Sequence, residues 1–171
     1  MKKISFILLL AIISMACKNQ EKIQQDSAVA ETTETTETTA PTPVKESLFI
    51  TMERTPCLGK CPSYAIWIYN TGRVEYEGRT FAEKEGKYTK TLSDAAMEEI
   101  TNKIKDIDFF NLEDKYDKLV TDIPSCIISV HLDGKKKKIL DRYNGPQGLR
   151  NLEKLIDYHV IDDELEKVTE E

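Results

Sequence analysis

The chain has few of the residues on which most enzyme mechanisms and metal sites depend. Its 171 residues include two histidines and four cysteines. A histidine-based mechanism has little choice here, because His131 and His159 have no carboxylate or nucleophile at a spacing that local geometry would bring together. A zinc site needs four Cys or His ligands in paired clusters, and the chain has one C-x3-C pair. We therefore predict no catalytic residue, no metal site and no cofactor.

Nucleotide-binding motifs and a basic surface are also missing from the sequence. It contains no G-x-G-x-x-G or P-loop pattern. The net charge is -6 at pH 7, and an acidic protein has no general attraction for nucleic acid or anionic lipid. The one concentrated run of positive charge is Lys135 to Lys138, which alternation on a strand would divide between two faces. We interpret it as protection of a strand edge, and we expect no nucleic-acid partner.

The first 16 residues have the pattern of a lipoprotein signal peptide. Lys2 and Lys3 precede the apolar run 4–13, which is far shorter than the roughly 20 residues of a spanning helix. The small residues of "SMAC" then lead to Cys17, and this junction resembles the bacterial lipobox, in which the cysteine is diacylated and becomes the new N-terminus. The alternative is an ordinary signal peptide with a chance cysteine. We expect cleavage before Cys17, a net charge of -8, and lipid anchoring of Cys17 in the cell envelope, at the outer membrane, facing periplasm or medium.

Residues 17–46 are predicted to be a lipidated cysteine followed by a disordered tether. The tether contains "ETTETTETT" and "APTPV" and almost no large apolar residues, so it cannot bury enough surface to offset its chain entropy. The tripeptide Asp26-Ser27-Ala28 resembles the O-glycosylation acceptor of Bacteroidota, although a match of three residues also arises by chance.

Residues 47–171 are predicted to form a single α+β domain that folds without the tether and ends in an acidic tail. Runs of alternating hydrophobicity are followed by stretches of helical period, which favours an antiparallel sheet with appended helices. Ser93 is a good N-cap for the first helix, and Pro146 precedes the second. We expect a four-stranded meander (48–54, 63–70, 73–79 and 86–92), a helix to Ile107, an irregular acidic stretch to Pro124, a β-hairpin (125–132 and 135–141), and a second helix.

The segment "RTPCLGKCPSY", residues 54–64, contains the most distinctive pair of residues in the chain. Extended residues four apart have Cα atoms about 13 Å apart, whereas a disulfide needs roughly 4.4 to 6.8 Å, so the chain must turn between Cys57 and Cys61. Gly59 would permit the turn and Pro62 would stiffen its exit. In an oxidising envelope compartment we predict a Cys57–Cys61 disulfide. Cys126, on an apolar strand face, is predicted to be a buried free thiol.

Several segments together carry a family resemblance. "RTPCLGKCPSY", "GRVEYEG", "FFNL", "TDIPS" and "DRYNGP" resemble an uncharacterised domain of unknown function from lipoproteins of Bacteroidota, over most of residues 48–158. The resemblance implies an envelope location and an expectation for the fold. It implies no activity and no catalytic residues.

Two classes of function are left open by the sequence. The first is a non-catalytic, lipid-anchored module that binds or braces an envelope protein or glycan, and this is the reading that we favour. The second is a thiol-redox or Cu(I)-binding protein, because the C-x3-C-P motif resembles that of the Sco family of copper chaperones. In that family a helix follows the motif, whereas "YAIWIY" after Pro62 has the pattern of a strand.

Overall fold

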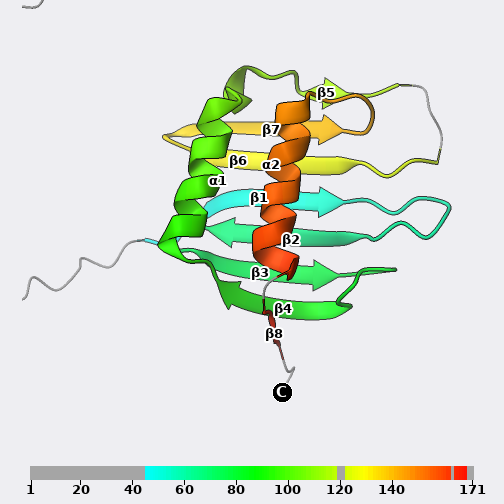
Figure 1. Ribbon diagram of the computed structural model, residues 1–171, viewed down its shortest axis with the longest axis horizontal. Coiled ribbons are helices and arrows are strands. Elements are labelled where there is room, and N and C mark those ends of the chain that lie inside the picture. Colours follow the sequence, from blue (N-terminus) through cyan, green and yellow to red (C-terminus); the bar gives the residue numbers. More distant parts are fainter. Residues whose placement is uncertain (1–44, 119–121, 163, 169–171) are drawn as a thin grey trace, which may run out of the picture. The chain divides into compact units, whose positions relative to one another are not determined.

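The computed structural model describes residues 45–118, 122–162 and 164–168. The signal peptide, Cys17, Asp26-Ser27-Ala28 and nearly all of the tether lie outside the described residues, so the predictions made for them stay predictions. The described part is an α+β fold with one sheet in the order β5-β7-β6-β1-β2-β3-β4-β8. Both helices cover the same face of this sheet (Figure 1).

The predicted meander is present at one side of the sheet. Its strands are β1 (Leu48–Arg54), β2 (Tyr64–Tyr69), β3 (Arg73–Gly78) and β4 (Gly86–Thr91), each antiparallel to the next. Strand β3 alternates as its sequence predicts, with Val74 and Tyr76 buried under the helices. Strand β2 lies between β1 and β3, with Tyr64, Ile66 and Ile68 buried on the helix-covered face and Trp67 and Tyr69 half-buried on the other.

Helices α1 (Asp94–Asp106) and α2 (Gln147–Asp157) pack their apolar stripes on the sheet. Ser93 caps α1 as predicted, since its side chain accepts a hydrogen bond of 3.2 Å from the amide of Ala96. The core is built from the inward residues of β1, β2, β3, β6 and β7 together with these stripes. In the described residues, no helix combines the length and the hydrophobicity needed to cross a membrane.

The hairpin and the chain end differ from the expected arrangement. Strands β6 (Cys126–Leu132) and β7 (Lys135–Asp141) do form a hairpin, but β6 pairs with β1, which makes one continuous sheet with the meander. Two short strands were not expected: β5 (Lys115–Tyr116), parallel to β7, and β8 (Glu166–Lys167), antiparallel to β4. Such two-residue strands form because a sheet edge offers unpaired backbone groups, and no local sequence pattern announces them.

The segments that join these elements contain two short irregular helices. Residues Phe109–Asn111 form the 3-10 helix η1, and Tyr158–Asp162 continue α2 as the π-helix η2. The acidic end, residues 162–171, was expected to be a frayed helix or tail, but its described part pairs with β4 through β8, and the Val168 amide donates to the Lys87 carbonyl at 3.0 Å. Two hydrogen bonds also join the residues of η2 to the segment around β4. Lys84 Nζ donates to the carbonyl of Ile161 at 2.8 Å, and Lys90 Nζ donates to that of His159 at 2.9 Å.

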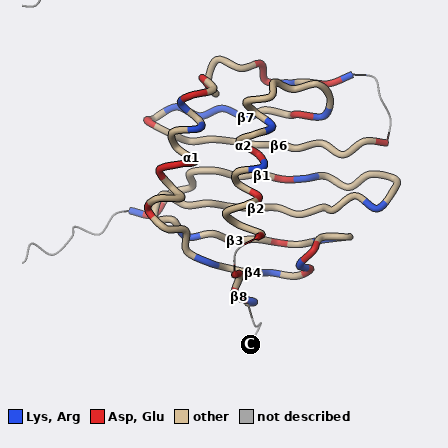
Figure 2. Tube along the Cα trace, in the orientation of Figure 1, with Lys and Arg blue, Asp and Glu red and all other residues tan. Residues whose placement is uncertain are grey.

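The lysine run lies where edge protection would be useful. Strand β5 pairs with β7 only at Leu140 and Asp141, so within the described residues the part of β7 that carries the lysines has a strand neighbour on one side only. Figure 2 shows this run as a continuous blue stretch on β7. Lys137 pairs with Asp114 at 2.6 Å, which accounts for one of the acidic residues of the stretch before the hairpin.

Candidate functional site

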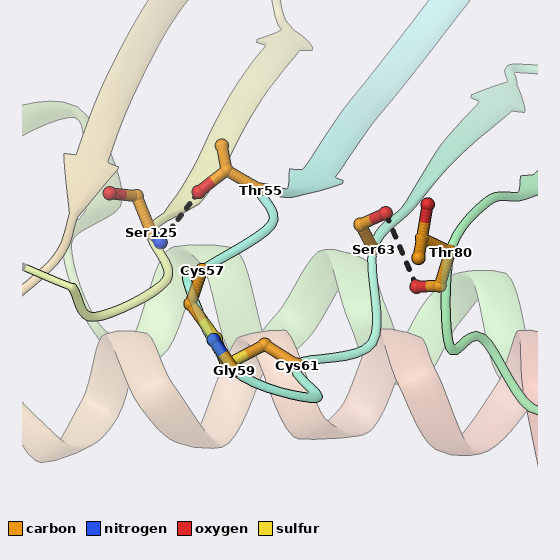
Figure 3. Close-up of a disulfide and its surroundings, with 7 residues drawn as sticks. All are labelled: Thr55, Cys57, Gly59, Cys61, Ser63, Thr80 and Ser125. Atoms are coloured by element: carbon orange, nitrogen blue, oxygen red, sulfur yellow. Dashed lines mark hydrogen bonds between the residues drawn. A yellow bond between two sulfur atoms is a disulfide. The ribbon is translucent and has the colours of Figure 1, made fainter.

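Cys57 and Cys61 are joined in the loop between β1 and β2. Their sulfur atoms lie 1.97 Å apart and their Cα atoms 5.7 Å apart, which is the geometry of a disulfide (Figure 3). Gly59 was expected to permit the turn, and the geometry of the loop does not require a glycine there. Gly59 has no positive φ, and a Cβ placed on it would meet only Cys57 Sγ, at 3.7 Å.

Both stems of this disulfide loop are tied to neighbouring segments. The Thr55 amide donates to the carbonyl of Ser125 at 2.9 Å, and Thr55 Oγ1 accepts from the Ser125 amide at 2.8 Å (Figure 3). On the other stem the Ser63 amide donates to the carbonyl of Thr80 at 3.0 Å. The loop is therefore positioned by β6 and β3 extensions as well as by its own disulfide. Strand β2 begins at Tyr64, directly after the loop, so the helix that would follow a Sco-like motif is replaced by a strand.

A pocket of about 640 Å³ lies beside this loop, at the end of the sheet where β1 and β7 finish and β2 and β6 begin. The disulfide loop contributes Lys60, Cys61 and Pro62 to its lining, and α2 contributes residues of its sheet-facing side. A volume of this size is ordinary for a small-molecule site. The buried and half-buried side chains of the lining include Arg54, Tyr64, Tyr76, Cys126, Asp141, Arg150, Glu153 and Asp157.

A network of three side chains crosses the pocket from the sheet to α2. Arg54 Nη2 donates to Asp157 Oδ2 at 2.6 Å, and Arg54 Nε donates to the Tyr64 hydroxyl at 2.8 Å. That hydroxyl in turn donates to Asp157 Oδ1 at 2.6 Å. Burial raises the pKa of Tyr64 well above its ordinary value, and the charge of Asp157 raises it further. Tyr64 is therefore a fixed hydrogen-bond donor at neutral pH.

Glu153 of α2 is a buried acid next to this network. Its side chain is 6% exposed, and its Oε2 lies 3.6 Å from Arg54 Nη1, beyond hydrogen-bonding distance. Burial raises the pKa of Glu153 to about 7, although the charge of Arg54 opposes the shift, and Asp141 adds to it. Near neutral pH this carboxyl group is poised between its acid and its ionised form.

Cys126 lies beside Glu153 and is more than the apolar filler that the sequence suggested. It is a free, buried thiol as predicted, 3% exposed at the start of β6. Burial raises its pKa well above the ordinary thiol value, and the charge of the neighbouring Glu153 adds to the shift. A thiol held protonated in this way is a poor nucleophile.

Two buried polar atoms of the pocket lack a hydrogen-bond partner. In the described residues the unpartnered buried side-chain atoms are Tyr76 Oη, Glu153 Oε1 and Asp117 Oδ1, and the first two belong to residues that line this pocket. Burial raises the pKa of Tyr76 to about 12, with Asp157 adding to the shift, so its hydroxyl is protonated. Unsatisfied buried polar groups are rare and costly, and here they gather in one cavity.

The turn between β7 and α2 shapes another wall of the pocket. Asp141 Oδ1 accepts a hydrogen bond of 3.2 Å from the amide of Gly145, and Arg150 donates to the Gly145 carbonyl. A Cβ on Gly145 would lie 2.3 Å from Asp141 Oδ2, so only glycine fits beside this carboxylate. Asn144 adopts a φ of 61°, a conformation that asparagine tolerates better than most residues.

Residues that the sequence offered as weaker candidates are not brought into the pocket. His131 lies on β6, and burial together with Lys136 lowers its pKa. His159 Nε2 lies 2.9 Å from Glu99 Oε2 of α1, a contact that local spacing could not have predicted. Asp117 pairs with Lys115 at 2.9 Å. Across the residues that the structure covers, no three His, Cys, Asp or Glu side chains are grouped closely enough to hold a metal ion.

Comparison with models of known families assigns the domain to a family. Residues 48–160 match the family described as "Domain of unknown function (DUF6438)". The chain belongs to this family. No curated protein matches the chain. The resemblance noted in the sequence is thereby confirmed as membership of an uncharacterised domain family. Four DUF6438 segments that carried the resemblance supply pocket residues: the disulfide loop, Tyr76 of β3, Pro124 with Ser125, and Asp141, Arg142 and Asn144.

Sequence reasoning located the disulfide loop of this DUF6438 domain but missed the acids behind it. Leu149, Leu152 and Ile156 mark the apolar stripe of α2, and Glu153 stands four residues after Leu149, which places it on the same face. An acidic residue within an apolar stripe was therefore the one local signal that could have indicated the buried Glu153. The partnership of Arg54 with Asp157, which are 103 positions apart, left no local signal at all.

Proposed function

We propose that the protein is a lipid-anchored lipoprotein of the cell envelope whose folded domain is a non-catalytic binding module, with the pocket as its ligand site. The observation that carries the binding proposal is the pair of unpartnered buried atoms, Tyr76 Oη and Glu153 Oε1, in one cavity. A cavity kept for structural reasons would be expected to satisfy its polar groups internally, whereas a ligand site leaves them for the ligand.

Further support comes from how the pocket is held. Arg54, Tyr64 and Asp157 form a closed hydrogen-bonded network, and the disulfide fixes the loop beside it. Side chains locked by such bonds present a rigid surface, which lowers the entropic cost of binding. The buried Cys126 thiol and the Tyr64 hydroxyl have pKa values that favour their protonated forms, which suits recognition better than nucleophilic chemistry.

The binding proposal is tested by mapping small probes on the protein by ¹H–¹⁵N NMR. The probes are 1-butylamine, butyrate, 1-butanol, glucose and glycylglycine, each at millimolar concentration. We expect at least one of them to shift the amide signals of pocket residues, such as Cys126 and Glu153, and to leave those of α1 unchanged. If none of the five perturbs the pocket, the pocket is not a ligand site of this kind and the proposal fails.

The anchoring proposal is independent of the pocket and rests on the "SMAC" junction. Replacing Cys17 with serine removes the thiol that would receive the lipid, so the variant is expected to leave the membrane fraction while the wild type stays in it. Cys126→Ser serves as the matched control, because it changes a cysteine of the folded domain. If the Cys17→Ser variant still sediments with membranes as the wild type does, lipid anchoring through Cys17 is refuted.

A further inference from the structure

The buried charge of this domain is negative and is concentrated at the pocket. In the described part of the chain the buried charged residues are Asp141 and Glu153, at 8% and 4% exposure, and both line the pocket. Burying a carboxylate is costly unless hydrogen bonds or a cation compensate it. Asp141 has the Gly145 amide as a partner, whereas Glu153 Oε1 has no partner within the protein.

The two half-buried arginines of the pocket, Arg54 and Arg150, do not bond with Glu153 Oε1. Arg54 is engaged with Asp157 and Tyr64, and it approaches Glu153 only through Oε2, at 3.6 Å. Arg150 donates instead to the Gly145 carbonyl and to Gln147 Oε1. Oxygen Oε1 of Glu153 is therefore a free acceptor on a buried acid, in a cavity where the carboxylates outnumber the guanidinium groups among the buried and half-buried residues.

Resting on the proposed function, we propose that the pocket recognises the primary ammonium group of a small alkylamine ligand, which donates a hydrogen bond to Glu153 Oε1. An ammonium group supplies the hydrogen-bond donor that Glu153 Oε1 lacks, and it adds a second positive charge to that of Arg54, which lies 3.6 Å from Oε2. A neutral hydroxyl would supply only the donor, and a carboxylate would face repulsion from Asp141 and Asp157.

The remaining lining suits the carbon chain of such a ligand. Tyr64, Tyr76, Pro124 and Ile161 add apolar surface around the acids. The hydroxyl of Tyr76 is unpartnered and protonated, so it is available to a second polar group of the ligand. An amine carried on a hydrocarbon stem matches these walls better than an amino sugar, whose ring is covered with hydroxyl groups that the walls would leave unpaired.

The experiment compares four probes on the full-length protein by ¹H–¹⁵N NMR titration. They are 1-butylamine, 1-butanol, tetramethylammonium and glucosamine, which separate charge, donor and carbon stem. We expect 1-butylamine to shift the pocket signals with the highest affinity. Tetramethylammonium carries the charge without an N–H donor, and 1-butanol carries the donor without the charge, so both are expected to bind more weakly by at least about tenfold. Stronger binding of glucosamine than of 1-butylamine would overturn the assignment to an alkylamine.

A variant pair assigns the effect to one carboxyl group. Glu153→Gln keeps the shape and removes the charge, and it is expected to weaken 1-butylamine binding by about tenfold or more. Glu98→Gln makes the same change at an exposed position of α1, and it is expected to bind as the wild type does. Unchanged affinity in a folded Glu153→Gln protein would overturn the inference.

The probe comparison on the wild type needs no variant, so it decides the inference even if Glu153→Gln fails to fold. Different outcomes refute the binding module and the ammonium assignment. If 1-butanol or butyrate occupies the pocket and 1-butylamine does not, the ammonium assignment is wrong and the binding module stands. If no probe reaches the pocket, the binding module itself is refuted.

Discussion

Helices α1 and α2 cover the same face of one sheet, but they bury different kinds of residue. Helix α1 buries only apolar side chains, Ala96, Ile100 and Ile104. Helix α2 buries Leu149, Leu152 and Ile156 in the same manner, and it also buries Glu153. The two helices have equivalent positions in the architecture, so the fold does not require the buried acid on α2.

This difference shows that the pocket at the end of the sheet departs locally from an otherwise apolar core. Where α1 meets the sheet, packing alone accounts for the residues. Where α2 meets it, Arg54 and Tyr64 of the sheet bond with Asp157 of α2. Such departures from the rules of core packing are expected at functional sites, because a purely stabilising interface has no use for a charge without a full set of partners.

The largest expected effect is on α1, the helix that buries only apolar side chains. Ile104→Ala on α1 leaves a cavity under a fully buried stripe, and it should lower the free energy of unfolding by about 2–5 kcal/mol. The measurement is urea denaturation followed by circular dichroism. Because the substitution removes only apolar atoms from a side chain that is 1% exposed, the loss should be the same at pH 5 and pH 8. Asn102→Ala, at an exposed position of α1, is the control and should change stability by about 0.5 kcal/mol or less.

The next largest effect tests the acid on α2. Groups that act on the Glu153 carboxyl are Arg54 of β1, Cys126 of β6, Asp141 of β7 and Asp157 of α2 itself. Because the fold raises the pKa of Glu153 from 4.5 to about 7, its stabilising contribution is complete below pH 4.5 and is lost as the pH rises through 7. Between these limits the loss is on the order of 3 kcal/mol.

Glu153→Gln cannot titrate, so it isolates this contribution. The wild type should lose stability as the pH rises from 4.5 to 8, and the variant should not. The difference in unfolding free energy between them should therefore shift in favour of the variant by on the order of 3 kcal/mol over this range. Paired urea denaturation curves at the two pH values measure the difference. Glu98→Gln is expected to show no such pH dependence. A difference between Glu153→Gln and wild type that stays constant over this range would mean that Glu153 is ionised throughout.

The sequence predicted α1 and the meander well because their signals are local. A cap at Ser93, a stripe of period 3.6 and strict alternation in β3 each depend on neighbours a few positions away. The continuous sheet was not predictable in this way, since the pairing of β6 with β1 joins segments about 75 residues apart. The same holds for the pocket, which forms only when α2 meets the ends of β1 and β6.

Removing the disulfide tests whether the residues around the pocket change their environment together. Replacing both Cys57 and Cys61 with serine frees a loop of about five residues, and the chain-entropy estimate gives a loss of about 2 kcal/mol. Because Lys60 to Pro62 line the pocket, NMR shift changes should reach Glu153 and should not reach Ile100 of α1. Shift changes of similar size on both helices would contradict the proposed difference between the packing of α1 and the pocket side of the core.

The oxidation state of this loop needs its own measurement. Alkylation of the protein isolated from its native cells without reductant, followed by mass spectrometry, should leave Cys57 and Cys61 unmodified. Modification of both thiols, or rapid exchange of the pair with glutathione, would favour the thiol-redox alternative over the binding module.

The smallest effect concerns how the two helices begin. Helix α1 has a side-chain cap at Ser93, whereas α2 starts after Pro146 without one and is reached through the Asp141–Gly145 turn of the pocket wall. Ser93→Ala should therefore cost about 1 kcal/mol, the usual value of an N-cap, and should leave 1-butylamine binding unchanged. Ser93→Asp, which restores a capping oxygen, should recover most of the loss. A change in pocket affinity on removing this cap would show that the start of α1 is coupled to the pocket, and that the two helices are less independent than their buried residues indicate.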